Sequence, residues 1–301
     1  MRLFLKRLLV FLLLLAAVLP PADFLFSRRA RLSTRPSIEG WYNLLYGQID
    51  ADLVILGSSR AKNHVDPDIL DSVLHTNSYN LGMSGTRIEM QLAQYELYRA
   101  HNKKPDVIVH CIDVFSLLPM TRVYNREQYF PFLWDRDFRK KVFPLVRFTL
   151  AERFIPFFRY YPTYMSDLLH RDSSSTRKGF HPLDLKWDSP TVKPVPFGME
   201  ERERSLFEQY VEKASNEGIR MVFVLPPLYY RKQVQNLDKM LDYYTELGNR
   251  YQIPLLNYYP SEICRDSTNF MDSNHLNRQG AEAFSDSLAR DLLVLKENGR
   301  L

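Results

Sequence analysis

The chain has 301 residues, of which 45% are hydrophobic and 13% aromatic, so it can bury a large core and is not a disordered protein. The formal net charge of +5 is mild for this length, and the basic residues are scattered, which gives no indication of nucleic-acid binding. Two cysteines, Cys111 and Cys264, cannot form a disulfide framework or a four-ligand zinc site. We expect two free thiols, with a single disulfide between them as the alternative, and no metal and no cofactor.

The N-terminus carries an apolar run with cations in front of it. Residues 8–19 read "LLVFLLLLAAVL" and are followed by two prolines and Asp23. A dozen apolar residues match a signal-peptide core and fall short of the roughly 20 that span a bilayer, although counting through Phe26 reaches that length. Because the small-x-small cleavage site is poor and no lipobox cysteine follows, we expect an uncleaved anchor over residues 1–26. A cleaved signal peptide and a buried core helix are the alternatives.

After a linker predicted over residues 27–50, short apolar segments alternate with helical patterns throughout a domain over residues 51–301. The predicted strands are residues 52–56, 78–81, 106–112, 220–225 and 253–257. The predicted helices are residues 66–74, 87–101, 199–217, 237–251 and 278–297. This order predicts an α/β fold, a parallel sheet with helices on both faces and right-handed crossovers.

An insertion over about residues 115–196 interrupts the alternation. It is rich in aromatic residues interleaved with charges, as in "NREQYFPFLWDRDFRKKVFPLVRF", and it is too long for a plain connection. We predict a helical insertion with a small aromatic core, and the alternative is that some aromatics face a ligand or the membrane surface. The polar segment at residues 172–178 is predicted to be an exposed loop.

In an open parallel sheet, ligands bind beyond the carboxyl ends of the strands, so the residues that follow each strand are the candidates for a site. Ser58, Ser59 and Arg60 follow the first strand in "VILGSSR". Asn80, Gly82, Ser84 and Gly85 follow the second strand, and Asp113 follows the third. Asp272 and His275 lie three residues apart in "FMDSNHLNRQ", just before the last helix, for which Asn277 is the predicted cap.

These residue types fit nucleophilic catalysis. A serine becomes a nucleophile when a histidine takes its proton, and a carboxylate fixes the tautomer of that histidine and stabilises the imidazolium. Gly-Ser-Ser and Asp-x-x-His are each weak signals alone. Their placement at opposite ends of an alternating strand and helix pattern, at the same predicted sheet edge, makes the combination stronger.

With these motifs the sequence resembles the SGNH/GDSL hydrolase superfamily, whose members share a flavodoxin-like three-layer α/β/α sandwich. The resemblance implies that Ser59 is the nucleophile, His275 the general base and Asp272 its partner, with the N–H groups of Ser59 and Gly85 as the oxyanion hole. It covers roughly residues 51–114 and 218–296. The third motif departs from the family, because Asp113 lies near the position of an oxyanion-binding Asn, and an ionised carboxylate there would repel the developing charge.

The form "GSSR" and the N-terminal anchor are most similar to the branch that contains D-alanyl transfer and alginate O-acetylation proteins. That resemblance implies an extracytoplasmic, membrane-anchored serine esterase or O-acyltransferase acting on acyl esters of envelope glycans, with a membrane-bound O-acyltransferase as partner. A non-catalytic accessory protein that binds such a partner or a glycan is the alternative. Arg60, Asn80 and Asp113 are candidates for contacts to substrate or across the sheet edge; for Arg60, steering an anionic substrate and pairing with Asp113 are both open.

Overall fold

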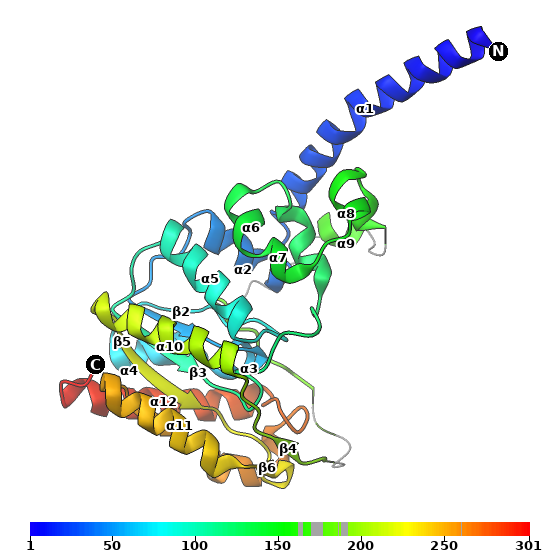
Figure 1. The fold of residues 1–301 in the computed structure, drawn as a ribbon. Helices are drawn as coiled ribbons and strands as arrows, with labels where there is room; N and C mark the ends of the chain where they lie inside the picture. Colours follow the sequence, from blue (N-terminus) through cyan, green and yellow to red (C-terminus); the bar gives the residue numbers. More distant parts are fainter. Residues whose placement is uncertain (162–164, 170–176, 186, 188–191, 260) are drawn as a thin grey trace. The chain divides into compact units, whose positions relative to one another are not determined.

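A computed structural model describes residues 1–161, 165–169, 177–185, 187, 192–259 and 261–301 (Figure 1). The chain divides into two compact units, one made of residues 1–42 and 125–175 and the other of residues 43–124 and 176–301. Most of the polar segment predicted as a loop at residues 172–178 lies outside the described residues.

The larger unit contains a five-stranded parallel sheet in the order β2-β1-β3-β5-β7. Counted along this sheet alone, the order is 2-1-3-4-5, the flavodoxin-like arrangement, so the predicted α/β fold with a parallel sheet is confirmed. The strands are β1 (Leu53–Leu56), β2 (Ser78–Asn80), β3 (Val107–Cys111), β5 (Arg220–Leu225) and β7 (Leu255–Asn257). A second parallel pair, β4 (Val195–Pro196) with β6 (Val234–Gln235), was not anticipated from the sequence.

Helices cover both faces of this sheet. The helices are α3 (Ser59–His64), α4 (Pro67–Leu74), α5 (Ile88–His101), α10 (Glu201–Asn216), α11 (Leu237–Tyr251) and α12 (Arg278–Glu297), with the short 3₁₀ helices η3 (Tyr230–Lys232), η4 (Glu262–Arg265) and η5 (Ser267–Asn269). Leu70, Phe284 and Leu288 from α4 and α12 pack in one core with alternate residues of β1, β3 and β5. On the opposite face, Phe207 of α10 contacts both Phe223 of β5 and Tyr244 of α11.

The physical basis of these layers is the alternation of side chains along each strand. Every residue of β1 and β3 is buried, as expected for strands covered on both faces. Each fully buried Leu or Phe contributes about 1.5–3 kcal/mol relative to leaving it exposed. The five helices predicted for this unit are present within one or two residues of their expected bounds.

The smaller unit combines the N-terminal helix with most of the aromatic insertion. Its elements are α1 (Arg2–Ala30), α2 (Pro36–Leu45, which continues into the larger unit), η1 (Arg126–Phe132), α6 (Arg136–Lys141), α7 (Phe143–Val146), α8 (Leu150–Phe154), η2 (Phe158–Tyr160) and α9 (Met165–Leu169). Trp41, Tyr129 and Phe138 are buried and their rings contact one another. Among the described aromatic residues that the insertion contributes to this unit, those buried in its core are Tyr129, Phe130, Phe132, Phe138, Phe148 and Tyr160, and those that stay exposed are Trp134, Phe154, Phe158 and Tyr161.

The boundaries differ from those drawn from the sequence. The predicted anchor at residues 1–26 is part of a helix that continues to Ala30, and the predicted linker at residues 27–50 contains the end of α1 and all of α2. Residues 115–124 and 176–196 of the predicted insertion group with the sheet. The sequence pattern did not show that the helices extend into residues 27–50, because apolar periodicity breaks off in the same way at the end of a buried helix and in an exposed linker.

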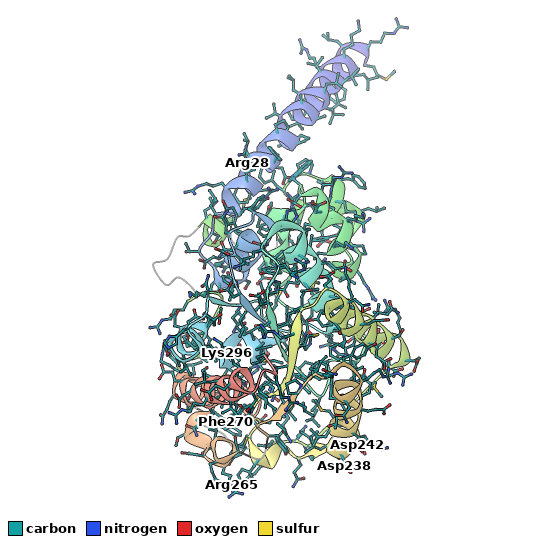
Figure 2. All side chains as sticks on the ribbon, turned by 90° about the vertical axis from the view of Figure 1, so that its left-hand side faces the viewer. Arg28, Asp238, Asp242, Arg265, Phe270 and Lys296 are labelled. Carbon is teal, nitrogen blue, oxygen red and sulfur yellow. The ribbon has the colours of Figure 1, made fainter. Side chains whose placement is uncertain are left out.

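Within the described residues, α1 is the one helix long and apolar enough to cross a membrane. In Figure 2, little covers the side chains of α1 that precede Arg28, and most of the apolar residues of this helix are exposed. Length and composition fit both an anchor and a signal sequence.

Candidate active site

The turn after β1 positions two serines differently. Gly57 has φ of +146°, and a Cβ atom at this position would come within 3 Å of Cys111 and Ala61, so only glycine fits. Ser58 is the N-cap of α3, and its Oγ accepts a hydrogen bond from the N–H of Arg60 at 3.3 Å. Ser59 is the first helical residue. The sharp exit from the strand therefore points the two hydroxyls to different partners.

Ser59 contacts a histidine from the other end of the chain. Its Oγ lies 2.8 Å from Nε2 of His275, and Nδ1 of His275 lies 2.9 Å from Oδ2 of Asp272. The His275 side chain is 23% exposed, so it is accessible from solvent. With the Nδ1–H donated to Asp272, Nε2 is left to accept the proton of Ser59. This is the geometry of a nucleophile, a general base and an orienting carboxylate.

The loop that carries His275 is held on both sides. Asp272 Oδ1 accepts the backbone N–H groups of Asn274 and His275, at 2.7 and 2.9 Å. Burial acts to raise the pKa of Asp272, but the hydrogen bond and charge of His275, together with these two N–H groups, hold the pKa below its ordinary value. The carboxylate is therefore ionised at neutral pH. Beyond the loop, Asn277 caps α12, as predicted, by accepting the N–H of Gly280.

His64 fixes the same loop from α3. Its Nε2 accepts the backbone N–H of Leu276, next to the candidate base, at 3.0 Å. His64 is fully buried, and burial followed by the charges of Arg60 and His275 lowers its pKa well below the ordinary value. A neutral ring is required for this acceptor role.

Asp113 is turned away from the nucleophile. Its Oδ2 accepts the hydroxyl of Ser58, and its Oδ1 pairs with the guanidinium of Arg60. Arg60 also donates to the backbone carbonyl of Pro226 in the loop after β5. The Arg60 side chain is 2% exposed, so it lies inside the protein and pairs with Asp113. This arrangement removes the predicted conflict, because the carboxylate is occupied by its own partners.

Asn80 is the last residue of β2, and Gly85 lies in the turn that follows it. The Asn80 amide donates to the carbonyls of Ala61 and Val65 and accepts the N–H of Gly82, so its polar atoms are used in fixing the loops. Gly85 has φ of +71°, and a Cβ atom here would collide with the ring of Tyr124. The close approach of Tyr124 to Gly85 could not be foreseen from the sequence.

Two lysines near the site were also missed. Lys232 of η3 donates to Ser273 Oγ at 3.2 Å; burial lowers its pKa, although the charge of Asp272 acts in the opposite direction. Lys62 of α3 is buried, which lowers its pKa to about 8. The sequence could have indicated both lysines by their position, since each lies in the segment that follows the carboxyl end of a strand, β1 for Lys62 and β5 for Lys232. No group of three or more His, Cys, Asp or Glu side chains among the described residues is placed to hold a metal ion.

No protein-family model and no curated protein matches this chain. Solved structures to which it is similar include a protein from Desulfitobacterium hafniense described as lipolytic and of the G-D-S-L family, with 11% identity and a TM-score of 0.46 over 80% of this chain and 99% of that one. A protein from Bacteroides fragilis described as an acylhydrolase has 12% identity and a TM-score of 0.42 over 88% and 98% of the two chains. A GDSL-like lipase from Bacteroides thetaiotaomicron has 11% identity and a TM-score of 0.40 over 89% and 99%. Because these TM-scores lie below 0.5, the fold assignment rests on the strand order, and the site rests on the contacts given above.

Proposed function

We propose that this protein is a membrane-anchored serine esterase or O-acyltransferase of the SGNH type, with its domain on the extracytoplasmic side and acyl esters of envelope glycans as substrates. The observation that carries the catalytic part is the chain of contacts from Ser59 Oγ through His275 to Asp272, at 2.8 and 2.9 Å. The anchor, the glycan and the side of the membrane are supported by the apolar α1 and by the motif resemblance.

In the proposed reaction, Ser59 Oγ attacks the ester carbonyl carbon while its proton passes to Nε2 of His275. Asp272 holds Nδ1–H and stabilises the imidazolium. The N–H groups of Ser59 and Gly85 bind the oxyanion of the tetrahedral intermediate. Collapse of this intermediate breaks the ester C–O bond, and His275 gives its proton to the departing alcohol.

The second half of the reaction decides between hydrolysis and transfer. His275 takes a proton from water or from a sugar hydroxyl, and the oxygen of that acceptor attacks the acyl-Ser59 carbonyl. Ser59 then leaves and regains its proton from His275. The product is a carboxylic acid when water is the acceptor and a new ester when a sugar hydroxyl is the acceptor. A membrane-bound O-acyltransferase is the proposed partner for the transfer reaction.

The alternative is a non-catalytic accessory protein that binds an acyltransferase or a glycan. One observation favours it: Asp113 stands where the related hydrolases carry Asn, and its oxygens bind Ser58 and Arg60, so the side chain offers no donor to an oxyanion. The two backbone N–H donors would then have to suffice, and losing one oxyanion donor costs an enzyme about 10²–10³ in kcat.

Labelling of the detergent-solubilised full chain by a fluorophosphonate separates the two proposals. We expect wild type to be labelled, Ser59→Ala and His275→Ala to lose labelling, and Ser58→Ala, the matched neighbouring serine, to keep it. Labelling that survives in Ser59→Ala would refute the assigned nucleophile. A folded wild type that is never labelled, with or without vesicles and acyltransferase, would favour the accessory protein.

Hydrolysis and transfer can then be distinguished with p-nitrophenyl acetate as donor. The initial rate of p-nitrophenol release and the amount of acetate formed are measured with and without an oligosaccharide acceptor. Acetylated oligosaccharide that is absent in Ser59→Ala would identify an O-acyltransferase. Acetate formation unaffected by the sugar would identify an esterase.

A further inference from the structure

The smaller unit exposes a cluster of apolar side chains that its aromatic core does not use. Within twelve residues of α8 and η2, five apolar side chains are exposed, with Phe154 and Tyr161 at 77% and 90%. We call these residues the α8–η2 patch: Leu150, Phe154, Ile155, Phe158 and Tyr161. Single exposed apolar residues are ordinary on protein surfaces, whereas a contiguous group indicates contact with a partner or a membrane.

Hydrogen bonds tie this segment to one level of α1. Asp23 of α1 is buried and pairs with Arg159 at 2.8 Å, and its other oxygen accepts the backbone N–H of Phe157 at 3.0 Å. One turn further along α1, the hydroxyls of Ser27 and Tyr160 are 2.9 Å apart. Figure 1 shows α8 and α9 beside this end of α1. Because α8 in turn packs against η2, the α8–η2 patch is fixed at the height of Asp23 along the axis of α1.

The length of the apolar part of α1 places that height near a bilayer surface. Residues 8–22 contain no charged side chain and form 15 residues of helix. At about 1.5 Å per residue this segment is about 22 Å long, which is shorter than the roughly 30 Å hydrocarbon core of a bilayer. A segment that is too short draws its flanking residues toward the lipid. The charge of Asp23, which would oppose this, is neutralised by Arg159.

Cations accompany the patch. Arg28 and Arg29 are exposed at the same end of α1, and Figure 2 labels Arg28 at the base of the projecting helix. Arg153 lies in α8 beside Phe154, with its guanidinium 4.2 Å from the ring centroid of Phe143. Apolar and aromatic groups next to basic side chains are the pattern of segments that lie in a membrane interface and attract anionic lipid.

We propose that the α8–η2 patch inserts into the interfacial layer of an anionic phospholipid bilayer beside the point where α1 leaves it. The smaller unit would then be a membrane-seating module with two contacts, one from α1 and one from the patch. This inference rests on α1 being the membrane segment and is independent of the esterase chemistry at Ser59.

The test uses the full chain reconstituted into vesicles of phosphatidylcholine and phosphatidylglycerol. Single cysteines are introduced as Phe154→Cys in the patch, Leu13→Cys within α1 and Lys140→Cys on the exposed side of α6, and each is labelled with the fluorophore NBD. The native Cys111 and Cys264 are buried, so unmodified protein serves as the labelling blank. Lipids that carry a nitroxide near the head group then quench a probe in the interface, and lipids that carry a nitroxide deep in the acyl chain quench a probe in the hydrocarbon core.

We expect most of the fluorescence to be lost at position 13 with the deep nitroxide and at position 154 with the head-group nitroxide, and little to be lost at position 140 with either lipid. Quenching at position 13 without quenching at position 154 would overturn the patch while leaving the anchor in place. No quenching at either position would overturn both. Equal quenching at positions 140 and 154 would also overturn the patch, because lipid contact would not select this face. Fluorophosphonate labelling of the same samples reports separately on Ser59.

Discussion

The pair of Arg60 and Asp113 leads to a quantitative prediction, because both side chains are almost fully buried, at 2% and 1% exposed. Asp113→Asn keeps the shape of the side chain and leaves an amide oxygen to accept the Ser58 hydroxyl. It removes the negative charge and replaces the oxygen that faces Arg60 with an NH2 group, so the guanidinium of Arg60 becomes a buried charge without its counterion or acceptor. Removing one partner of a buried ion pair costs about 3–5 kcal/mol.

This loss should be visible in thermal unfolding of the detergent-solubilised chain. For a unit of this size, 1 kcal/mol corresponds to roughly 2–4 °C, so Asp113→Asn should lower Tm by about 6–20 °C. Arg60→Met should be destabilising for the same reason. The double variant Arg60→Met/Asp113→Asn removes both charges, and it should lose less stability than the two single losses added together.

A matched control is the pair of Arg99 and Glu217, whose side chains are 24% and 30% exposed. Arg99→Met should cost at most about 1 kcal/mol, because solvent screens a partly exposed pair. If Asp113→Asn has the same Tm as wild type, or if the stability lost by the double variant equals the sum of the losses of the two single variants, the two charges do not stabilise each other. The account of this site is then wrong.

Three further predictions concern glycine, lysine and aspartate. Gly85→Ala should lower Tm more than Gly218→Ala, although both glycines have φ of +71°, because only the methyl group at position 85 meets a ring, that of Tyr124. In a Tyr124→Ala background the two losses in Tm should become equal; equal losses already in the presence of Tyr124 would contradict this. Lys62→Met should raise the free energy of unfolding at pH 7 by up to about 3 kcal/mol, and Tm with it, since burial lowers the pKa of Lys62 from 10.5 to about 8. Between pH 8 and 10.5 only the unfolded state keeps the Lys62 proton, so wild type gains stability as the pH is raised. The difference in stability between Lys62→Met and wild type should therefore shrink over this range. A difference that stays constant would refute the buried charge. The pKa of Asp272 in the folded state is lowered, so the Asp272 carboxylate stabilises the fold at pH values above its ordinary pKa of 3.8, and this stability is lost as the pH falls through the folded-state pKa. The Tm difference between wild type and Asp272→Asn should therefore narrow on acidification. A Tm difference independent of pH would exclude this contribution.

The sequence by itself determined the α/β fold, because strands buried on both faces and amphipathic helices leave local patterns that need no partner to be recognised. It also predicted that Ser59, His275 and Asp272 meet at one edge of the sheet: Ser59 because it follows a parallel strand, and the other two because a short loop before the last helix returns them to that edge. The choice of Ser59 over Ser58 came from motif resemblance. Their different partners, His275 and Asp113, became visible only in the structure.

Tertiary structure decided what depends on distant pairs. Arg60 and Asp113 are 53 positions apart in the chain, and Asp23 and Arg159 are 136 positions apart. In each pair a buried charge that would be unfavourable alone is neutralised by the opposite charge of its partner. Periodicity reports only which face of an element is apolar, so it cannot reveal such pairs. For the same reason, the sequence placed a linker where α1 continues and joins the insertion in one folded unit.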